Sequence, residues 1–241
     1  VLAFTYLRKA VESYGAIGLA AVSVTALGLA GGLNVYGYHS LDTERYAFTP
    51  VVQTMTTDEW RTNGWQQLPP YRIDMFGEIE EPMTIQWAGN LSAIEMDLQK
   101  NGWRMPVPWT ATYALGWLTA NAAPAELPVM PHLASGRLPS LTAVLAGDKA
   151  PEASRFLLRL WASDLELSDG SSSKVWVGSV VEENLVRPIS LITIAEPRSD
   201  ANAPRDMLFG ASQREWHVAR PGVTESSNWD GRVLLLDENS Q

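Results

Sequence analysis

Residues 154–182 read SRFLLRLWASDLELSDGSSSKVWVGSVVE, and this stretch decides the fold. Its two ends, Ser154 to Ser163 and Lys174 to Glu182, are rich in the apolar and β-branched side chains that are typical of strands. The segment between them, Asp164 to Ser173, is polar and predicts a hairpin loop. The stretch therefore predicts two neighbouring strands that follow each other in the chain.

Alternation of apolar and polar residues predicts further strands on both sides of this hairpin. Tyr71 to Phe76 and Met83 to Trp87 both show the two-residue period of a half-buried strand, and Glu78 to Pro82 is predicted to form the turn between them. The remaining predicted strands are Leu141 to Ala146, Ile189 to Ala195, Trp216 to Ala219 and Arg232 to Leu236.

Three helices are predicted among these strands. The first begins at Thr57, a suitable N-cap, and the second runs from Ser92 to Trp103 with capping-box spacing. Both end in the triplet NGW, at 63–65 and 101–103, where glycine accepts the C′ conformation and the tryptophan folds back onto the core. A third helix is predicted from Thr110 to Asn121. The sequence therefore predicts an α+β fold with a mostly antiparallel sheet and about three helices.

An apolar run from Tyr14 to Tyr38 contains no charged residue and no proline. Read as a helix, it is long enough to cross a bilayer, so the α+β domain is predicted to be preceded by one transmembrane helix over 14–38. Arg8 and Lys9 precede the run, which places the flank 1–13 in the cytoplasm by the positive-inside rule. Residues 39–56 are then a connector, and 57–241 form an extracytoplasmic domain at a bacterial inner membrane, facing the periplasm or the exterior.

Small residues within this run recur four positions apart, at Ala16 and Ala20 and at Gly28 and Gly32. This spacing lets membrane helices pack closely, so a second helix is an expected partner besides the lipid bilayer. Two alternatives stay open for the run: a cleaved signal peptide, and a buried helix of a soluble protein.

Composition excludes several classes of function. The chain has no cysteine, so it has no disulfide, no thiolate nucleophile and no cysteine-based metal site. Its formal net charge is −9, which disfavours binding to the phosphate backbone of nucleic acids.

The sequence contains no recognised catalytic or nucleotide-binding motif, and it predicts neither a metal nor a cofactor. The three histidines, His39, His132 and His217, have no metal-ligand spacing. His132 is the best functional candidate because it lies in a loop with Arg137. The acidic residues Asp74, Glu78, Glu80 and Glu81 are interpreted as a solvated loop, although paired carboxylates can hydrolyse glycosides.

The ten tryptophans are an unusual feature of the composition. Seven are expected to pack in the core: Trp65, Trp87, Trp103, Trp117, Trp161, Trp176 and Trp216. The other three, Trp60, Trp109 and Trp229, are candidates for an exposed surface that stacks on a ligand or fills a pocket of a partner.

Several strings resemble a known family. They are NGWQQLP (63–69), RIDMFGE (72–78), TIQWAG (84–89), GWRMP (102–106), ELPVMPHLASGR (126–137), LRLW (158–161) and VWVGSV (175–180). Together they resemble the LssY C-terminal domain family. The resemblance implies a domain of a bacterial membrane protein, often found behind a polytopic domain that handles lipids, with no established catalytic residue of its own.

These observations support three hypotheses. The first is a non-catalytic interaction or accessory domain that docks a lipid-handling or secretion-associated membrane protein or an upstream polytopic domain. The second is a module that binds a glycan or a lipid headgroup through exposed tryptophan together with Arg72, Arg137 or His132, with Asp74 as a further candidate. The third is a hydrolase of unrecognised type.

Overall fold

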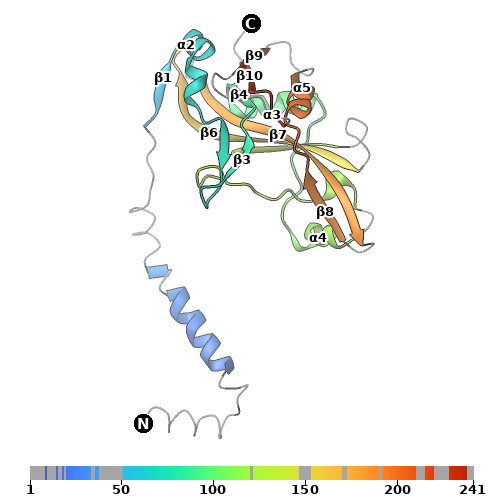
Figure 1. Cartoon of the computed structure of the whole chain (residues 1–241). Coiled ribbons are helices and arrows are strands. Elements are labelled where there is room, and N and C mark those ends of the chain that lie inside the picture. The colour runs from blue at the N-terminus through green and yellow to red at the C-terminus, as the bar shows by residue number, and fades with distance from the viewer. Residues whose placement is uncertain are drawn as a thin grey trace. The chain divides into compact units, whose positions relative to one another are not determined.

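The computed structural model (Figure 1) divides the chain into two units, Val1–Pro50 and Val51–Gln241. It describes residues 9, 15, 18, 20–33, 36–37, 51–119, 122–146, 153–169, 173–189, 192–209, 215–219 and 228–237.

In the first unit, the continuous helix that the structure describes runs over residues 20–33. Among the described residues, no helix combines the length and the apolar character that crossing a membrane requires. The prediction of a transmembrane helix over 14–38 finds no support among these residues, since the described helix of 20–33 is shorter than a span of about 20 residues. Gly28 and Gly32 have no neighbour within 4 Å of an added Cβ, and Ala20 is exposed. Ala16 lies outside the described residues, as do most of 1–13 and 39–50.

The second unit is built on the hairpin of β6 (Ser154–Leu167) and β7 (Ser173–Ile189), which pair in antiparallel fashion as the sequence predicts. β5 (Leu141–Leu145) and β1 (Gln53–Met55) pair with β6, while β4 (Ile85–Ala88) and β8 (Ile192–Pro197) pair with β7. β10 (Arg232–Asp237) and β9 (Glu215–Ala219) continue the sheet beyond β4. The two long strands curve through the whole unit, with α2 near one end and α4 near the other (Figure 1).

The predicted fold class is wrong in the proportion of strands to helices. The unit is dominated by one curled eight-stranded sheet, and two of its pairings, β1 with β6 and β4 with β10, are parallel. A second sheet contains β2 (Tyr71–Ile73) and β3 (Ile79–Pro82). β3 occupies the predicted turn, and the chain instead reverses at Asp74, whose carboxylate accepts hydrogen bonds from the backbone N–H groups of Phe76 and Glu78.

The helices are short and differ from the three expected. They are α2 (Thr57–Thr62), α3 (Leu91–Lys100), α4 (Ala111–Ala114) and α5 (Asn202–Phe209), with 3₁₀ turns η1 (Gly64–Gln67), η2 (Leu115–Leu118) and η3 (Pro124–Glu126). The predicted helix over 110–121 is reduced to α4 and η2, because α4 buries no side chain that would stabilise a longer helix. α5 was not predicted.

The two NGW triplets end their helices in different ways. Gly102 has a φ of 94°, the left-handed conformation that the sequence predicts after α3. Gly64 instead starts η1, and a Cβ at this position would collide with the side chain of Met55. Both tryptophans, Trp65 and Trp103, are buried as expected.

Strand alternation divides the core between the two faces of the sheet. On β10, Leu234 and Leu236 join the cluster that packs against Ile94 and Leu98 of α3. Val233 and Leu235 point to the opposite face, into a cluster with Trp60 and Trp229. On β6, Leu158 and Leu160 belong to the first cluster, so the residues between them lie on the opposite face, where the candidate site is found.

Candidate functional site

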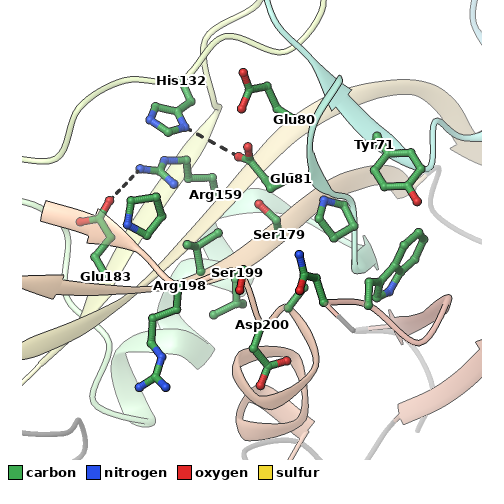
Figure 2. A pocket seen from close by; sticks show the side chains of 17 residues that line it. Tyr71, Glu80, Glu81, His132, Arg159, Ser179, Glu183, Arg198, Ser199 and Asp200 are labelled. Carbon is green, nitrogen blue, oxygen red and sulfur yellow. Dashed lines mark ion pairs between the residues drawn. The ribbon is translucent and has the colours of Figure 1, made fainter. Parts of the chain in front are cut away.

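A pocket of about 380 Å³ lies against this opposite face of β6 and β7 (Figure 2). β3 contributes Glu80 and Glu81, the loop over residues 127–134 contributes His132, and the segment after β8 contributes Arg198, Ser199 and Asp200. The other residues that line it are Tyr71, Pro82, Arg159, Ser179, Val180, Val181, Glu183, Pro197, Ala201, Asn228 and Trp229.

The register of the hairpin sets the polar side chains of the pocket floor. Arg155 lies opposite Glu183, and Arg159 lies opposite Ser179. Cross-strand partners of this kind project from the same face of a sheet, with Cβ atoms about 5 Å apart. The strand pairing thus places two arginines, one glutamate and one serine side by side on a buried surface.

All three guanidinium nitrogens of Arg155 have a partner. Its Nη2 and Nε atoms lie 2.9 and 3.0 Å from Glu183 Oε2. Its Nη1 donates to the carbonyl oxygens of Leu127 at 2.6 Å and Pro124 at 3.2 Å, and the guanidinium stacks over Trp117. Burial lowers the pKa of Arg155, and Glu183 opposes this shift. Arg155 therefore ties the hairpin to the loop that covers it.

Arg159 is as deeply buried as Arg155, with 1% of its surface exposed, but its interactions are weaker. Its Nη2 lies 3.7 Å from Glu183 Oε1 and 3.5 Å from the carbonyl oxygen of Met130. Its Nε has no hydrogen-bond partner among the described residues. Burial lowers the pKa of this guanidinium, while the charges of Glu183 and Glu81 only partly offset the effect.

Glu81 forms the opposite wall together with Arg72 and His132. Arg72 Nη2 lies 2.8 Å from Glu81 Oε2 and 3.5 Å from Glu80 Oε2. His132 Nδ1 lies 3.7 Å from Glu81 Oε1, as the dashed line in Figure 2 marks. Burial raises the pKa of Glu81, but its contacts with His132 and Arg72 outweigh burial and bring the pKa down to about 2.

The 127–134 loop covers the pocket floor and is held by its carbonyl groups. Besides the bond from Arg155 to Leu127, Trp109 Nε1 donates to Val129 at 2.7 Å and Arg72 Nη1 to Leu133 at 2.8 Å. Trp161 Nε1 donates to the carbonyl oxygen of His132 at 3.3 Å. Side chains from β2, β6 and the segment before α4 therefore converge on one loop.

The structure brings together only some of the residues predicted for a site. Arg72 and His132 meet at Glu81, beside the pocket. Arg137 instead pairs with Asp164 at 2.9 Å, and Asp74 caps the turn between β2 and β3. Neither of these two residues lines the pocket.

The three tryptophans predicted for an exposed surface also differ in whether the structure exposes them. The expectation of an exposed Trp60 or Trp229 is corrected, because the structure buries both in the core. Trp60 donates its indole N–H to Gln86 Oε1 at 2.9 Å, and Trp229 stacks edge-on against Tyr71 at the margin of the pocket. Trp109 is half exposed, but its indole N–H is committed to the 127–134 loop.

The carboxylates of Asp74, Glu78 and Glu80 lie within 4.8 Å of one another. Three carboxylate oxygens can in principle bind a divalent cation. Glu78 and Glu80 are exposed, however, and Asp74 already accepts two backbone hydrogen bonds in the turn. These three residues form a solvated acidic hairpin, whereas Glu81, which the sequence analysis assigned to the same solvated loop, lies in the pocket wall with Arg72 and His132.

The sequence analysis missed the pocket-lining residues Arg159, Ser179 and Glu183, as well as Arg155, which pairs with Glu183. The sequence contains a signal for two of them, because Arg155 and Arg159 stand four residues apart in a strand that is apolar from Phe156 to Leu158 and at Leu160 and Trp161. Arginines at every fourth position of such a strand lie on one face, where they need buried partners. Ser179 and Glu183 follow only from the register of β7.

The fold and the pocket define a strand-rich α+β domain with a charged, loop-covered cavity on one face of its sheet. The profile of the family described as LssY C-terminus matches residues 65–232, more than half of the chain. The chain therefore belongs to this family, which confirms the resemblance found in the sequence. Comparisons with curated proteins and with solved structures give no match.

Proposed function

We propose that the domain is a non-catalytic binding module that takes a small polar ligand in the pocket between β3, the β6–β7 hairpin and the 127–134 loop. One observation carries this proposal. Arg159 Nε and Ser179 Oγ are buried polar atoms without a hydrogen-bond partner among the described residues, and both residues line the pocket, as do Glu81 and His132, whose Oε1 and Nδ1 atoms make only a contact of 3.7 Å with each other. Leaving such atoms unpaired costs free energy that a bound ligand recovers.

The charges of the pocket support binding more than catalysis. A general acid or base works best when its pKa lies near the operating pH. The pKa of Glu81 is instead lowered to about 2, and Glu183 is held by two arginines. Such carboxylates are suited to fixing the walls of a cavity.

Titration of the full chain with a panel of glycan fragments and lipid headgroups, followed by calorimetry, tests the proposal. A ligand of the pocket should bind the Ser179→Ala variant roughly three- to tenfold more weakly, because one neutral hydrogen bond is lost. The Ser92→Ala variant serves as a matched control, since Ser92 is exposed on α3. Equal binding to both variants, or no binding at all, contradicts the proposal.

A second candidate function is docking to a protein partner through the β2–β3 hairpin. Met75, Phe76 and Ile79 are 67, 82 and 72% exposed, and Asp74 and Glu78 flank them. An apolar tip with an acidic border is complementary to an apolar partner surface with basic residues around it. This feature supports the hypothesis of an accessory domain for a lipid-handling or secretion-associated membrane protein. The Phe76→Ser variant should lose co-purification with such a partner while binding of the pocket ligand is unchanged.

A further inference from the structure

We infer that the ligand of this pocket carries an anionic oxygen-bearing group, a phosphate or a carboxylate, which Arg159 and Ser179 bind. This inference rests on the proposed binding function and adds the chemical class of the ligand. It follows from which charges around the pocket are already paired.

Three buried arginines beside the pocket have only two close carboxylate partners. Arg72, Arg155 and Arg159 are each at most 6% exposed, and the carboxylates that pair with them below 3 Å are those of Glu81 and Glu183. Glu81 is claimed by Arg72 at 2.8 Å, and Glu183 by Arg155 at 2.9 Å. The ion pair of Arg159 is longer, since its Nη2 lies 3.7 Å from Glu183 Oε1. A buried guanidinium that is poorly compensated favours an additional anion.

The other acidic groups at the pocket are also occupied by groups other than Arg159. Glu80 lies 3.5 Å from Arg72. Asp200 accepts hydrogen bonds from the backbone N–H groups of Asn202 and Ala203, where α5 begins. Arg198 is half exposed and pairs with Glu182 at 3.6 Å. Arg159 and Arg198 thus both have long ion pairs, but Arg198 is in contact with solvent whereas Arg159 is buried.

Ser179 supplies a second donor at the same place. It lies opposite Arg159 in the hairpin register, it is 1% exposed, and its hydroxyl has no partner among the described residues. Figure 2 shows both side chains among those that line the pocket, with the guanidinium of Arg159 directed toward Glu183. The Cβ atoms of such a cross-strand pair are about 5 Å apart, so the long side chain of Arg159 and the hydroxyl of Ser179 can donate to two oxygens of one oxyanion. Hydrogen bonds of this charge-assisted kind are about twice as strong as neutral ones.

Calorimetric titration of the full chain with glycerol 3-phosphate and with glycerol compares ligands that differ in the anionic group. We expect binding of glycerol 3-phosphate but not of glycerol. Vesicles of phosphatidic acid in phosphatidylcholine, compared with pure phosphatidylcholine, then show whether the same group is taken from a lipid surface or from a soluble compound. Acetate tests the carboxylate.

Substitutions of Arg159 and Ser179 test whether these two residues contact the anion. Arg159→Gln should weaken binding of the anion roughly 10- to 100-fold, the range of a lost charged hydrogen bond. Arg187→Gln, which removes the same charge from an exposed position of β7, should bind as the natural chain does. If Arg159→Gln does not fold, Ser179→Ala should still weaken binding roughly three- to tenfold.

The outcomes separate this inference from the proposed function. If a neutral glycan binds and Ser179→Ala weakens it while anions do not bind, the pocket is a binding site but the anionic class is wrong. If no compound binds at all, both proposals fail. Binding of anions that is equal in the natural chain, Arg159→Gln and Ser179→Ala also overturns the inference, because the contact then lies elsewhere.

Discussion

Two buried arginines in this domain have opposite surroundings. Arg205 on α5 forms a bidentate pair with Asp230 at 2.6 and 3.1 Å, and its Nε donates to Asp206 at 2.8 Å. Burial lowers the pKa of Arg205, but these two carboxylates outweigh it and raise the pKa. Arg159 is equally buried, yet it shares its nearest carboxylate with Arg155 and its pKa is lowered. Complete pairing marks a structural arginine, whereas incomplete pairing at a cavity marks an arginine that is available to a ligand.

The largest effect on stability is expected from Arg205→Met. This change leaves Asp230 without its guanidinium; breaking one side of a fully buried pair costs about 3–5 kcal/mol, and the lower end of this range is expected because Asp230 is 29% exposed. Denaturation by urea, followed through tryptophan fluorescence, measures the loss of unfolding free energy. A loss below about 1 kcal/mol would show that the pairing of Arg205 is no more important to the fold than that of Arg159.

Acidification should have a smaller effect, through the pocket wall. The pKa of Glu81 is lowered from 4.5 to about 2 in the folded chain, so its contribution to stability is fully present above pH 4.5. This contribution, about 2 kcal/mol after allowance for partial exposure, is lost as the pH falls from 4.5 toward 2. Asp230 also has a lowered pKa and adds to acid sensitivity. The Glu81→Gln variant isolates the pocket, since its stability should fall less steeply over this range; identical profiles would contradict the assignment.

The smallest effect on stability is expected from Arg159→Met. Its ion pair is long, Glu183 keeps Arg155 as a partner, and a methionine of similar length can pack in the same space. We expect a change in unfolding free energy of less than about 1 kcal/mol, because replacing a poorly paired buried charge by an apolar side chain is often neutral. A loss as large as that of Arg205→Met would assign Arg159 a structural role.

The sequence was most informative where local rules decide. The hairpin of β6 and β7 follows from composition, the left-handed Gly102 follows from the NGW triplet, and the burial of Trp65 and Trp103 follows from their positions after helix ends. Local rules failed for the helix expected over 110–121, because no buried face supports it beyond α4 and η2. They also failed for Gly64, whose role is to leave space for Met55 and not to adopt a special φ.

The candidate site was only partly predictable, since it depends on contacts between distant segments. His132 and Arg72, two of the residues that the sequence selected, both contact Glu81 beside the pocket, but Glu81, which joins them, had been assigned to a solvated loop. The pairing of Arg159 with Ser179 requires the register of two long strands, and no short motif encodes it. Trp60 and Trp229 gave no sign in the sequence that they are buried.

The attachment of the 127–134 loop has a consequence for how the domain can diversify. Every residue carries a carbonyl group, so the anchors formed by Trp109, Trp161 and the arginines do not depend on which side chains the loop presents. Positions such as Met130, which is 57% exposed, are free to change without loosening the cover. The side chains of the loop can thus differ while its backbone anchors stay the same. Selectivity for a ligand can therefore change separately from folding.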